Sequence, residues 1–222
     1  MIITIDGYAG SGKTSAARAV AAALGFDLLN TGGMYRAAAV ALGRHGIDIY
    51  ADSRDATAVG ALVAEFVFDM PPGRVVLCGT DYTADVRCEE AGRGASRVGT
   101  FPEVRAHLKR EQRRLADARN IVCEGRDQGT AVFPEAPVKF FFTASPEVRA
   151  RRRVMQLTAH GLPADPDEIL RQIIDRDRQD EGRVIDPLRR APDAVAVDTT
   201  GASVEEVLAG MLEVVNRCRL AP

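Results

Sequence analysis

The sequence predicts an α/β protein built on a parallel sheet with helices on both faces. Two observations support this prediction. First, five short apolar segments, which begin near residues 2, 26, 120, 138 and 194, mostly alternate with helix-forming stretches. Second, the first segment runs directly into the glycine-rich loop GYAGSGKTS and then into a helical stretch, which is the strand–loop–helix order of a phosphate-binding unit.

The glycine-rich loop is a Walker A motif, in which Gly7, Gly12, Lys13 and Thr14 fill the pattern G-x-x-x-x-G-K-[ST]. Glycines allow backbone N–H groups to approach a phosphate chain closely, and the start of the following helix adds the positive end of its dipole. In this motif the lysine bridges the β- and γ-phosphates of a nucleotide, and the hydroxyl binds Mg²⁺. The loop therefore predicts a nucleotide site with Thr14 at the metal.

The elements of the first half follow from their apolar patterns. A short buried strand runs into NTGGMYR, whose glycines mark a turn into an alanine-rich helix. A local hairpin around Pro71-Pro72-Gly73 then interrupts the parallel pattern, which indicates an inserted subdomain. The elements expected here are a strand at 2–5, a helix at 15–24, a strand at 26–29, helices at 34–44 and 55–65, hairpin strands at 66–69 and 74–78, and an exposed loop at 83–96 that leads into a helix.

The second half continues the alternation of strands and helices. Buried strands of such sheets place ligand groups at their carboxyl ends, so we expect Glu124, Arg126 and Asp127 to be functional. The elements expected here are a helix at 101–117, strands at 120–124 and 138–143, a helix that begins near Ser145 with Pro146 in its first turn, a helix that ends in RDRQDEGR, a strand at 194–198 and a helix at 204–215.

Arginines gather on the two helices that follow residue 145. The first carries arginines at positions 149, 151, 152 and 153; because these spread around the helix, at most two can face one phosphate, and we expect the others to be solvated. On the second, Arg176, Asp180 and Arg183 share one face. Spacing alone favours surface ion pairs for these three residues.

Composition narrows the class of protein. The chain of 222 residues has a formal net charge of −2, which argues against a dedicated nucleic-acid or membrane-surface binder. The four cysteines lack any CxxC spacing, so neither a zinc site nor a disulfide framework is indicated. No apolar run approaches the length of a membrane span, and the start of the chain lacks the pattern of a signal peptide. We expect a soluble protein of the cytoplasm.

Motifs along the whole chain resemble those of the bacterial-type cytidylate kinases, in the same order. They are IDGYAGSGKTS, NTGGMYR, VRCEEAGRGAS, FPEVR, EGRDQGTAVFPEA, TASPEVRARRR, RDRQDEGR and VDTTG. The resemblance implies the nucleoside-monophosphate kinase fold with strand order 2-3-1-4-5. It implies one domain over residues 1–222, with a core at 1–52 and 98–222, an acceptor-binding insert at about 53–97 and a lid at about 154–167.

The resemblance also implies an activity, which is transfer of the γ-phosphoryl group of ATP to CMP or dCMP by a monomer that uses Mg²⁺ and binds no nucleic acid. Lys13, Arg126 and Arg176 would act in catalysis. The implied ATP-binding residues are Gly7, Tyr8, Ala9, Gly10, Ser11, Gly12, Lys13, Thr14, Ser15 and Arg152. The implied acceptor-binding residues are Thr31, Tyr35, Arg36, Ser96, Arg105, Arg126, Asp127, Arg176, Asp180 and Arg183; among these, the resemblance places Ser96, Arg105, Asp127 and Arg183 at the cytosine.

Three residues depart from the pattern of this family. Tyr8 replaces the usual proline, with little effect expected because its side chain precedes the phosphate-cradling amides. Asn30 replaces an aspartate and so removes a carboxylate. Gln128 replaces an apolar residue and is expected to alter packing beneath the acceptor.

Alternative functions remain open at this point. The nearest is a P-loop kinase for another acceptor, such as UMP, AMP or shikimate. A regulatory GTPase is a weaker alternative, because the guanine-reading NKxD motif is missing and the DxxG pattern at 198–201 follows the last expected strand. A nucleic-acid-binding module is disfavoured by the charge balance.

Overall fold

The computed structural model describes residues 1–51, 53, 55–159 and 161–220. It consists of two compact units, the first formed by Met1–Leu28 and Asn120–Pro222 and the second by Leu29–Arg119. Within the expected insert and lid, Arg54 and His160 lie outside the described residues.

The predicted five-stranded sheet is confirmed, with the strand order β2-β6-β1-β7-β8. Numbered along the chain among themselves, these strands have the expected order 2-3-1-4-5. The central strand β1 is parallel to both neighbours, so that Ile3 pairs with Val122 on one side and with Val138 on the other. The strands are β1 (Ile2–Gly7), β2 (Asp27–Asn30), β6 (Ile121–Gly125), β7 (Val138–Thr143) and β8 (Val195–Asp198).

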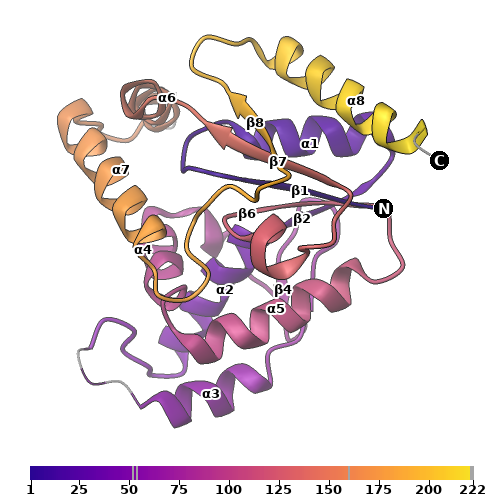
Figure 1. Ribbon diagram of the computed structural model, residues 1–222. Helices are drawn as coiled ribbons and strands as arrows, with labels where there is room; N and C mark the ends of the chain where they lie inside the picture. The colour runs from indigo at the N-terminus through magenta and orange to yellow at the C-terminus, as the bar shows by residue number, and fades with distance from the viewer. Residues whose placement is uncertain (52, 54, 160, 221–222) are drawn as a thin grey trace. The chain divides into compact units, whose positions relative to one another are not determined.

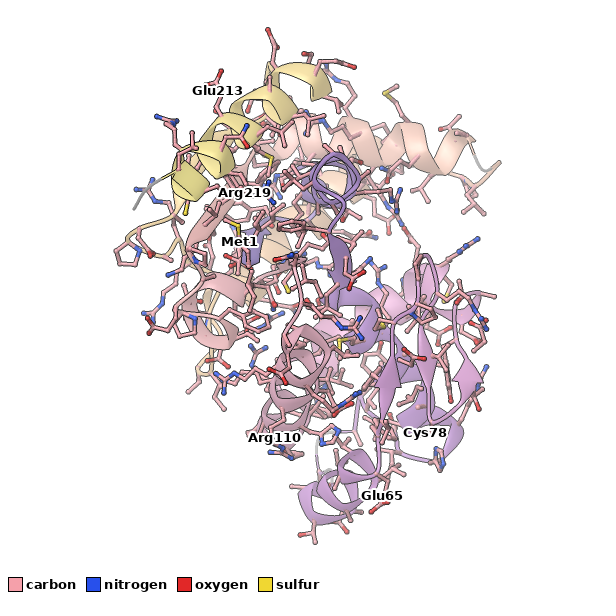
Figure 2. The ribbon with its side chains drawn as sticks, turned by 90° about the vertical axis from the view of Figure 1, so that its right-hand side faces the viewer. Met1, Glu65, Cys78, Arg110, Glu213 and Arg219 are labelled. Carbon is pink, nitrogen blue, oxygen red and sulfur yellow. The ribbon has the colours of Figure 1, made fainter. Side chains whose placement is uncertain are left out.

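Two helices of the first unit, α1 (Lys13–Leu24) and α8 (Val204–Leu220), lie side by side along the sheet (Figure 1). Alternate strand residues point toward these helices, and burial of each large apolar side chain contributes about 1.5–3 kcal/mol. Alanines on α1 allow it to lie close to the strands. The core consists of Ile3, Ile5, Ala16, Ala17, Val20, Ala21, Val122, Val138, Phe140, Phe142, Met211 and Val215. Near the end of α8, Arg219 (labelled in Figure 2) lies 5.0 Å from the centre of the Phe26 ring.

The helices α6 (Pro146–Ala159) and α7 (Pro166–Glu181) pack against each other in the first unit (Figure 1). Ala150 and Leu157 of α6 meet Ile169 and Ile173 of α7 in a small apolar core. The Asp165 side chain caps α7, since it accepts hydrogen bonds from the first-turn N–H groups. α6 begins at Pro146, where the sequence predicts it.

The second unit combines helices with a small antiparallel sheet, β3-β4-β5. The sheet extends the predicted hairpin by one strand. Cys78, which follows β4, donates its thiol to the Glu65 carbonyl at 3.3 Å (both labelled in Figure 2). The elements are α2 (Thr31–Arg44), α3 (Ala56–Ala64), β3 (Phe68–Asp69), β4 (Val76–Leu77), β5 (Thr80–Asp81), the 3₁₀ turn η1 (Asp85–Arg87), α4 (Glu89–Val98) and α5 (Pro102–Ala116).

A helix follows the loop expected at 83–96, but it begins earlier than expected, because α4 starts within that segment at Glu89. The helix is capped by the Cys88 thiol, which accepts a hydrogen bond from Ala91 N at 3.4 Å. Cysteine is not among the usual capping residues, so the start of the helix was not recognisable. α4 packs on α2 at Gly94, where a Cβ atom would lie only 2.9 Å from Ala39 Cβ. Gly94 therefore serves helix packing, whereas a Cβ atom at Gly92 would meet nothing within 4 Å.

Two further observations concern the cysteines and the apolar character of the helices. The four cysteines are free thiols. Among the helices of the described residues, none has the length and apolar character needed to cross a membrane.

Candidate active site

The phosphate loop wraps over the start of α1. β1 ends at Gly7, where a Cβ atom would lie 2.2 Å from the Phe142 carbonyl oxygen of β7. Gly12 precedes α1 in the left-handed conformation, with φ of 85°, which glycine adopts without strain. Inside the loop, the Ser11 hydroxyl donates to the Tyr8 carbonyl at 2.9 Å. The loop thus presents the free N–H groups of a helix start, which suit an anion.

Lys13, the first residue of α1, is only 7% exposed. Its Nζ donates to the Tyr8 carbonyl at 3.2 Å. Burial, together with the positive charge of Arg126, lowers the pKa of Lys13 to about 7, although Glu124 opposes the shift. The ammonium group therefore lies in a buried position near another positive charge, and a bound phosphate would stabilise its charged form.

A hydroxyl and a carboxylate meet beside the lysine. Thr14 Oγ1 donates to Glu124 Oε2 at 2.8 Å, and Glu124 is buried at the end of β6. Both are the hard oxygen donors that Mg²⁺ prefers, and this ion takes few protein ligands because it keeps water and substrate phosphates. The pair therefore fits Mg²⁺. Glu124 was expected to be functional because it ends a buried strand, but no role was predicted for it.

A buried cluster of charges forms around Asp180 of α7, which is 1% exposed. Its carboxylate accepts from Arg126 Nε at 2.8 Å and from Arg183 Nη2. Burial opposes ionisation, but Arg126, Arg183 and Arg176 hold the pKa of Asp180 below its ordinary value. The interpretation as surface ion pairs is therefore wrong for Asp180, because spacing along a helix does not reveal which face is buried.

Arg152 of α6 lies beside the phosphate loop. Its guanidinium donates to the Thr199 carbonyl at 2.6 Å, to Thr199 Oγ1 at 3.0 Å and to the Gly10 carbonyl at 3.5 Å. The Thr199 hydroxyl in turn donates to the Ser11 carbonyl at 2.9 Å. Thr199, in the VDTTG motif after β8, was missed as a site residue, and its place directly after the last predicted strand was the available signal.

Arg149 differs from the expectation for its helix. We expected the arginines of α6 that do not face a phosphate to be solvated, but Arg149 is 3% exposed and pairs with Asp177 of α7 at 2.6 Å. Arg151, by contrast, is exposed. The difference arises because α7 covers the face of α6 that carries Arg149.

Asp6 is a second residue that was missed. It lies in β1 just before the loop, and its two oxygens accept from Gln128 N at 2.8 Å and Gly129 N at 2.7 Å. Burial, reinforced by the charge of Asp127, raises the pKa of Asp6 to about 7. The bonds anchor a π-helical turn, η2 (Gln128–Val132), directly after Asp127. An acid inside an apolar strand was the available signal.

Gln128 lies in this anchored turn and is fully buried. Its side-chain Nε2 lies 3.4 Å from Asp127 Oδ1. The departure from an apolar residue therefore brings a polar amide to Asp127, in addition to any change in packing.

The remaining predicted residues belong to the second unit. Thr31 starts α2 and is buried. The Asn30 side chain caps this helix by accepting from Gly33 N at 3.0 Å, so the amide oxygen can perform this task without a carboxylate. The structure brings Tyr35 and Arg105 together, with the guanidinium carbon 5.8 Å from the ring centre. Arg105 is buried and also donates to the Gly99 carbonyl at 3.2 Å.

Ser96 and Arg36 complete the set in the second unit. Ser96 lies on α4, which packs on α2, the helix that carries Arg36. Among the described residues, the buried Ser96 hydroxyl has no hydrogen-bond partner. Such a group costs free energy unless a ligand or water satisfies it.

Comparison with known proteins gives a consistent result. A family model described as cytidylate kinase matches residues 3–217. The chain is 44% identical over 214 residues to a cytidylate kinase of Thermotoga petrophila, covering 96% of each protein. It is 40% identical over 210 residues to a cytidylate kinase of Azotobacter vinelandii, covering 94% of this chain and 92% of that protein. A solved structure of an uncharacterized protein from Eubacterium ventriosum is 11% identical, with a TM-score of 0.51 and coverage of 97% and 98%, which supports the fold alone.

Proposed function

Because this chain belongs to the cytidylate kinase family, we propose that it transfers the γ-phosphoryl group of ATP to CMP or dCMP. The observation that carries the proposal lies within the first unit, where Arg126 and Arg176 are near enough to Lys13 to lower its pKa. A cluster of partly buried arginines thus accompanies the phosphate loop. Two phosphate-bearing ligands would bring negative charge to these cations.

The proposed reaction needs no covalent enzyme intermediate. An oxygen of the acceptor phosphate attacks the γ-phosphorus, the bond from that phosphorus to the β-phosphate oxygen breaks, and ADP leaves. Since the acceptor phosphate is already an anion at neutral pH, a general base is not required. Lys13, Arg126 and Arg176 align the two anions and stabilise charge on the transferred group through a loose transition state.

Thr14 and Glu124 are the residues proposed to hold Mg²⁺ with ATP. When bound, Mg²⁺ would supply positive charge that offsets the charge of the ATP phosphates. Thr14 would bind through its hydroxyl, and Glu124 would act directly or through water. Loop closure would exclude water from the transfer, and we propose that the segment at about 154–167 acts as that lid.

Acceptor recognition is divided among the predicted residues. Cytosine offers an amino donor at N4 beside acceptors at N3 and O2, and this pattern suits a carboxylate together with cationic and hydroxyl donors. Asp127, Arg183, Ser96 and Arg105 provide such groups. The buried Ser96 hydroxyl, which has no protein partner among the described residues, supports a ligand contact there. Thr31, Tyr35 and Arg36 are proposed for the ribose and phosphate.

A panel of acceptors tests the proposed function. The purified protein is incubated with Mg²⁺ and ATP and, separately, with CMP, dCMP, UMP, AMP, GMP or shikimate, and the products are separated by chromatography. We expect CMP and dCMP to react well ahead of the others and chelation with EDTA to stop the reaction. Product from UMP, AMP or shikimate but not from CMP would overturn the proposal; the family match does not favour those acceptors.

Binding of ATP is expected to depend on pH through Lys13. In the protein without nucleotide, Lys13 loses its proton above a pH of about 7, because its pKa is lowered to about 7. The phosphates of bound ATP raise that pKa, so Lys13 keeps its proton in the complex. At a pH of about 8, binding therefore takes up close to one proton, and ATP affinity falls as the pH rises. Titration calorimetry in two buffers of different ionisation enthalpy measures this uptake. Lys13→Arg should abolish it, since arginine stays charged; unchanged uptake in that variant would assign the proton to another group.

We also propose that the enzyme works as a monomer in the cytoplasm and needs no nucleic acid. The free cysteines suit a reducing compartment. The net charge of −2 argues against nucleic-acid binding. Sedimentation of the purified protein tests the oligomeric state.

A further inference from the structure

The side chain of Tyr8 joins the phosphate loop to the end of α7. Its ring meets Phe141 of β7 edge to face, with ring centres 5.9 Å apart. The guanidinium carbon of Arg149 lies 5.1 Å from the centre of the same ring. Beyond the ring, the hydroxyl donates to Glu181 Oε1 at 2.6 Å, and Glu181 is the last residue of α7. One side chain therefore spans from the loop to the helix.

A second connection lies beside the first. Arg149 makes a bidentate ion pair with Asp177, at 3.0 and 2.6 Å, and also donates to the Ala9 carbonyl of the loop at 3.3 Å. Its Nε is fixed by the Ala144 carbonyl at 2.9 Å. Asp177 and Glu181 lie four residues apart and so share one face of α7. The loop and that helical face thus meet at two adjacent points.

The neighbouring face of α7 carries residues proposed for the acceptor. Arg176 directly precedes Asp177, and Asp180 directly precedes Glu181. Arg176 and Asp180 therefore lie about 100° around the helix from those two residues. Asp180 holds Arg126 and Arg183, and its carbonyl accepts from Leu188 N at 2.8 Å. Because a helical turn is rigid, a contact that fixes one face also fixes the direction of the other.

We propose that Tyr8 is a positioning residue for phosphoryl transfer, whose hydroxyl bond to Glu181 holds the end of α7 so that Arg176 and Asp180 face the acceptor. The proposal rests on the proposed acceptor, CMP or dCMP. In this proposal Tyr8 helps to position α7, whereas the sequence led us to expect little effect from tyrosine in place of the usual proline. The side chains of the Arg149–Asp177 pair are 3% and 14% exposed, whereas Glu181 is exposed, so the Tyr8 bond is the more solvent-accessible of the two connections.

The direction of the hydrogen bond is defined. Burial and the carboxylate of Glu181 raise the pKa of Tyr8 to about 12. The phenol therefore keeps its proton and donates it to the carboxylate throughout the working pH range. A charged acceptor makes such a bond stronger than one between neutral groups.

Removal of the hydroxyl in Tyr8→Phe is the direct test. We expect KM for CMP to rise by about 3–10-fold, because a smaller population of the free enzyme has α7 in place, and kcat to change by less than about twofold, because bound substrates restore it. Glu181→Gln should have a similar effect. The double variant Tyr8→Phe/Glu181→Gln should be no worse than either single one, since both remove the same bond.

Matched controls separate this effect from general destabilisation. Tyr50→Phe removes the hydroxyl of an exposed tyrosine, and Asp175→Asn neutralises an exposed carboxylate on α7; both should leave KM unchanged. Hydrogen exchange without nucleotide provides a readout that is independent of the acceptor, and Tyr8→Phe should increase exchange at 177–185. Failure of the wild type to use CMP would refute the proposed function, while this exchange result would still report on the tether.

Three outcomes would overturn the proposal. One is an unchanged KM for CMP in Tyr8→Phe. Another is a double variant in which the two effects multiply. The last is unchanged hydrogen exchange at the end of α7.

Discussion

Replacement of Lys13 by alanine is expected to lower kcat by about a thousandfold or more, with the fold retained. The lysine is proposed to supply positive charge to the transferred phosphoryl group, and the chain has only two other lysines, Lys109 and Lys139. Loss of the side chain should cost little stability, because its ammonium is buried near Arg126, which disfavours the charge. Steady-state kinetics with saturating ATP and CMP measures the effect.

Lys109→Ala is the matched control for this variant and should retain normal turnover. Circular dichroism and thermal unfolding of both variants report on the fold. Normal turnover in a folded Lys13→Ala protein would show that the loop is not the donor site.

Replacement of Gly7 by alanine is expected to destabilise the protein by about 2–5 kcal/mol. The new Cβ would lie 2.2 Å from the Phe142 carbonyl oxygen, and φ at this position is 146°. β1 and β7 would have to separate at the point where Gly7 pairs with Phe142. For a chain of this size, thermal unfolding should begin roughly 5–20 °C lower.

Two other glycines provide controls for Gly7→Ala. Gly25 also has a positive φ, of 66°, but a Cβ there would meet nothing within 4 Å, so Gly25→Ala isolates the cost of the backbone conformation at about 1–2 kcal/mol. Gly210 lies in α8 with open space around it, and Gly210→Ala should stabilise the helix by about 0.5–1 kcal/mol. A Gly7→Ala protein as stable as Gly25→Ala would contradict the steric argument.

The sheet and most helices were predictable because local patterns carry them. The strand at 138–143 was predicted with its observed bounds, since a continuous apolar run between turn signals is typical of a buried parallel strand. Pro146 correctly located the start of α6. The glycine-rich loop was predictable for a further reason, namely that its chemistry requires particular residues at a fixed spacing.

Features that depend on contacts distant in sequence were not predictable in this way. Asp180 has the same helical spacing as a surface ion pair, but it is buried, and its partner Arg126 comes from another element that helical spacing does not reveal. Asp6 reads as one polar residue in an apolar strand, while its function as an anchor depends on the turn at Gln128. The roles of the site residues therefore remain predictions that the experiments above test.

The sheet order has a consequence for how the protein folds. β1 pairs with β6 and β7 rather than with the strand that follows it in the chain. The bond from Gly129 to Asp6 spans 123 positions. Phe142, which pairs with Gly7, lies still further along the chain. Contacts between such distant segments slow folding, because a long loop must close before they form. During synthesis the phosphate loop therefore emerges well before the strands that enclose it, and it can acquire its shape only after β7 has left the ribosome.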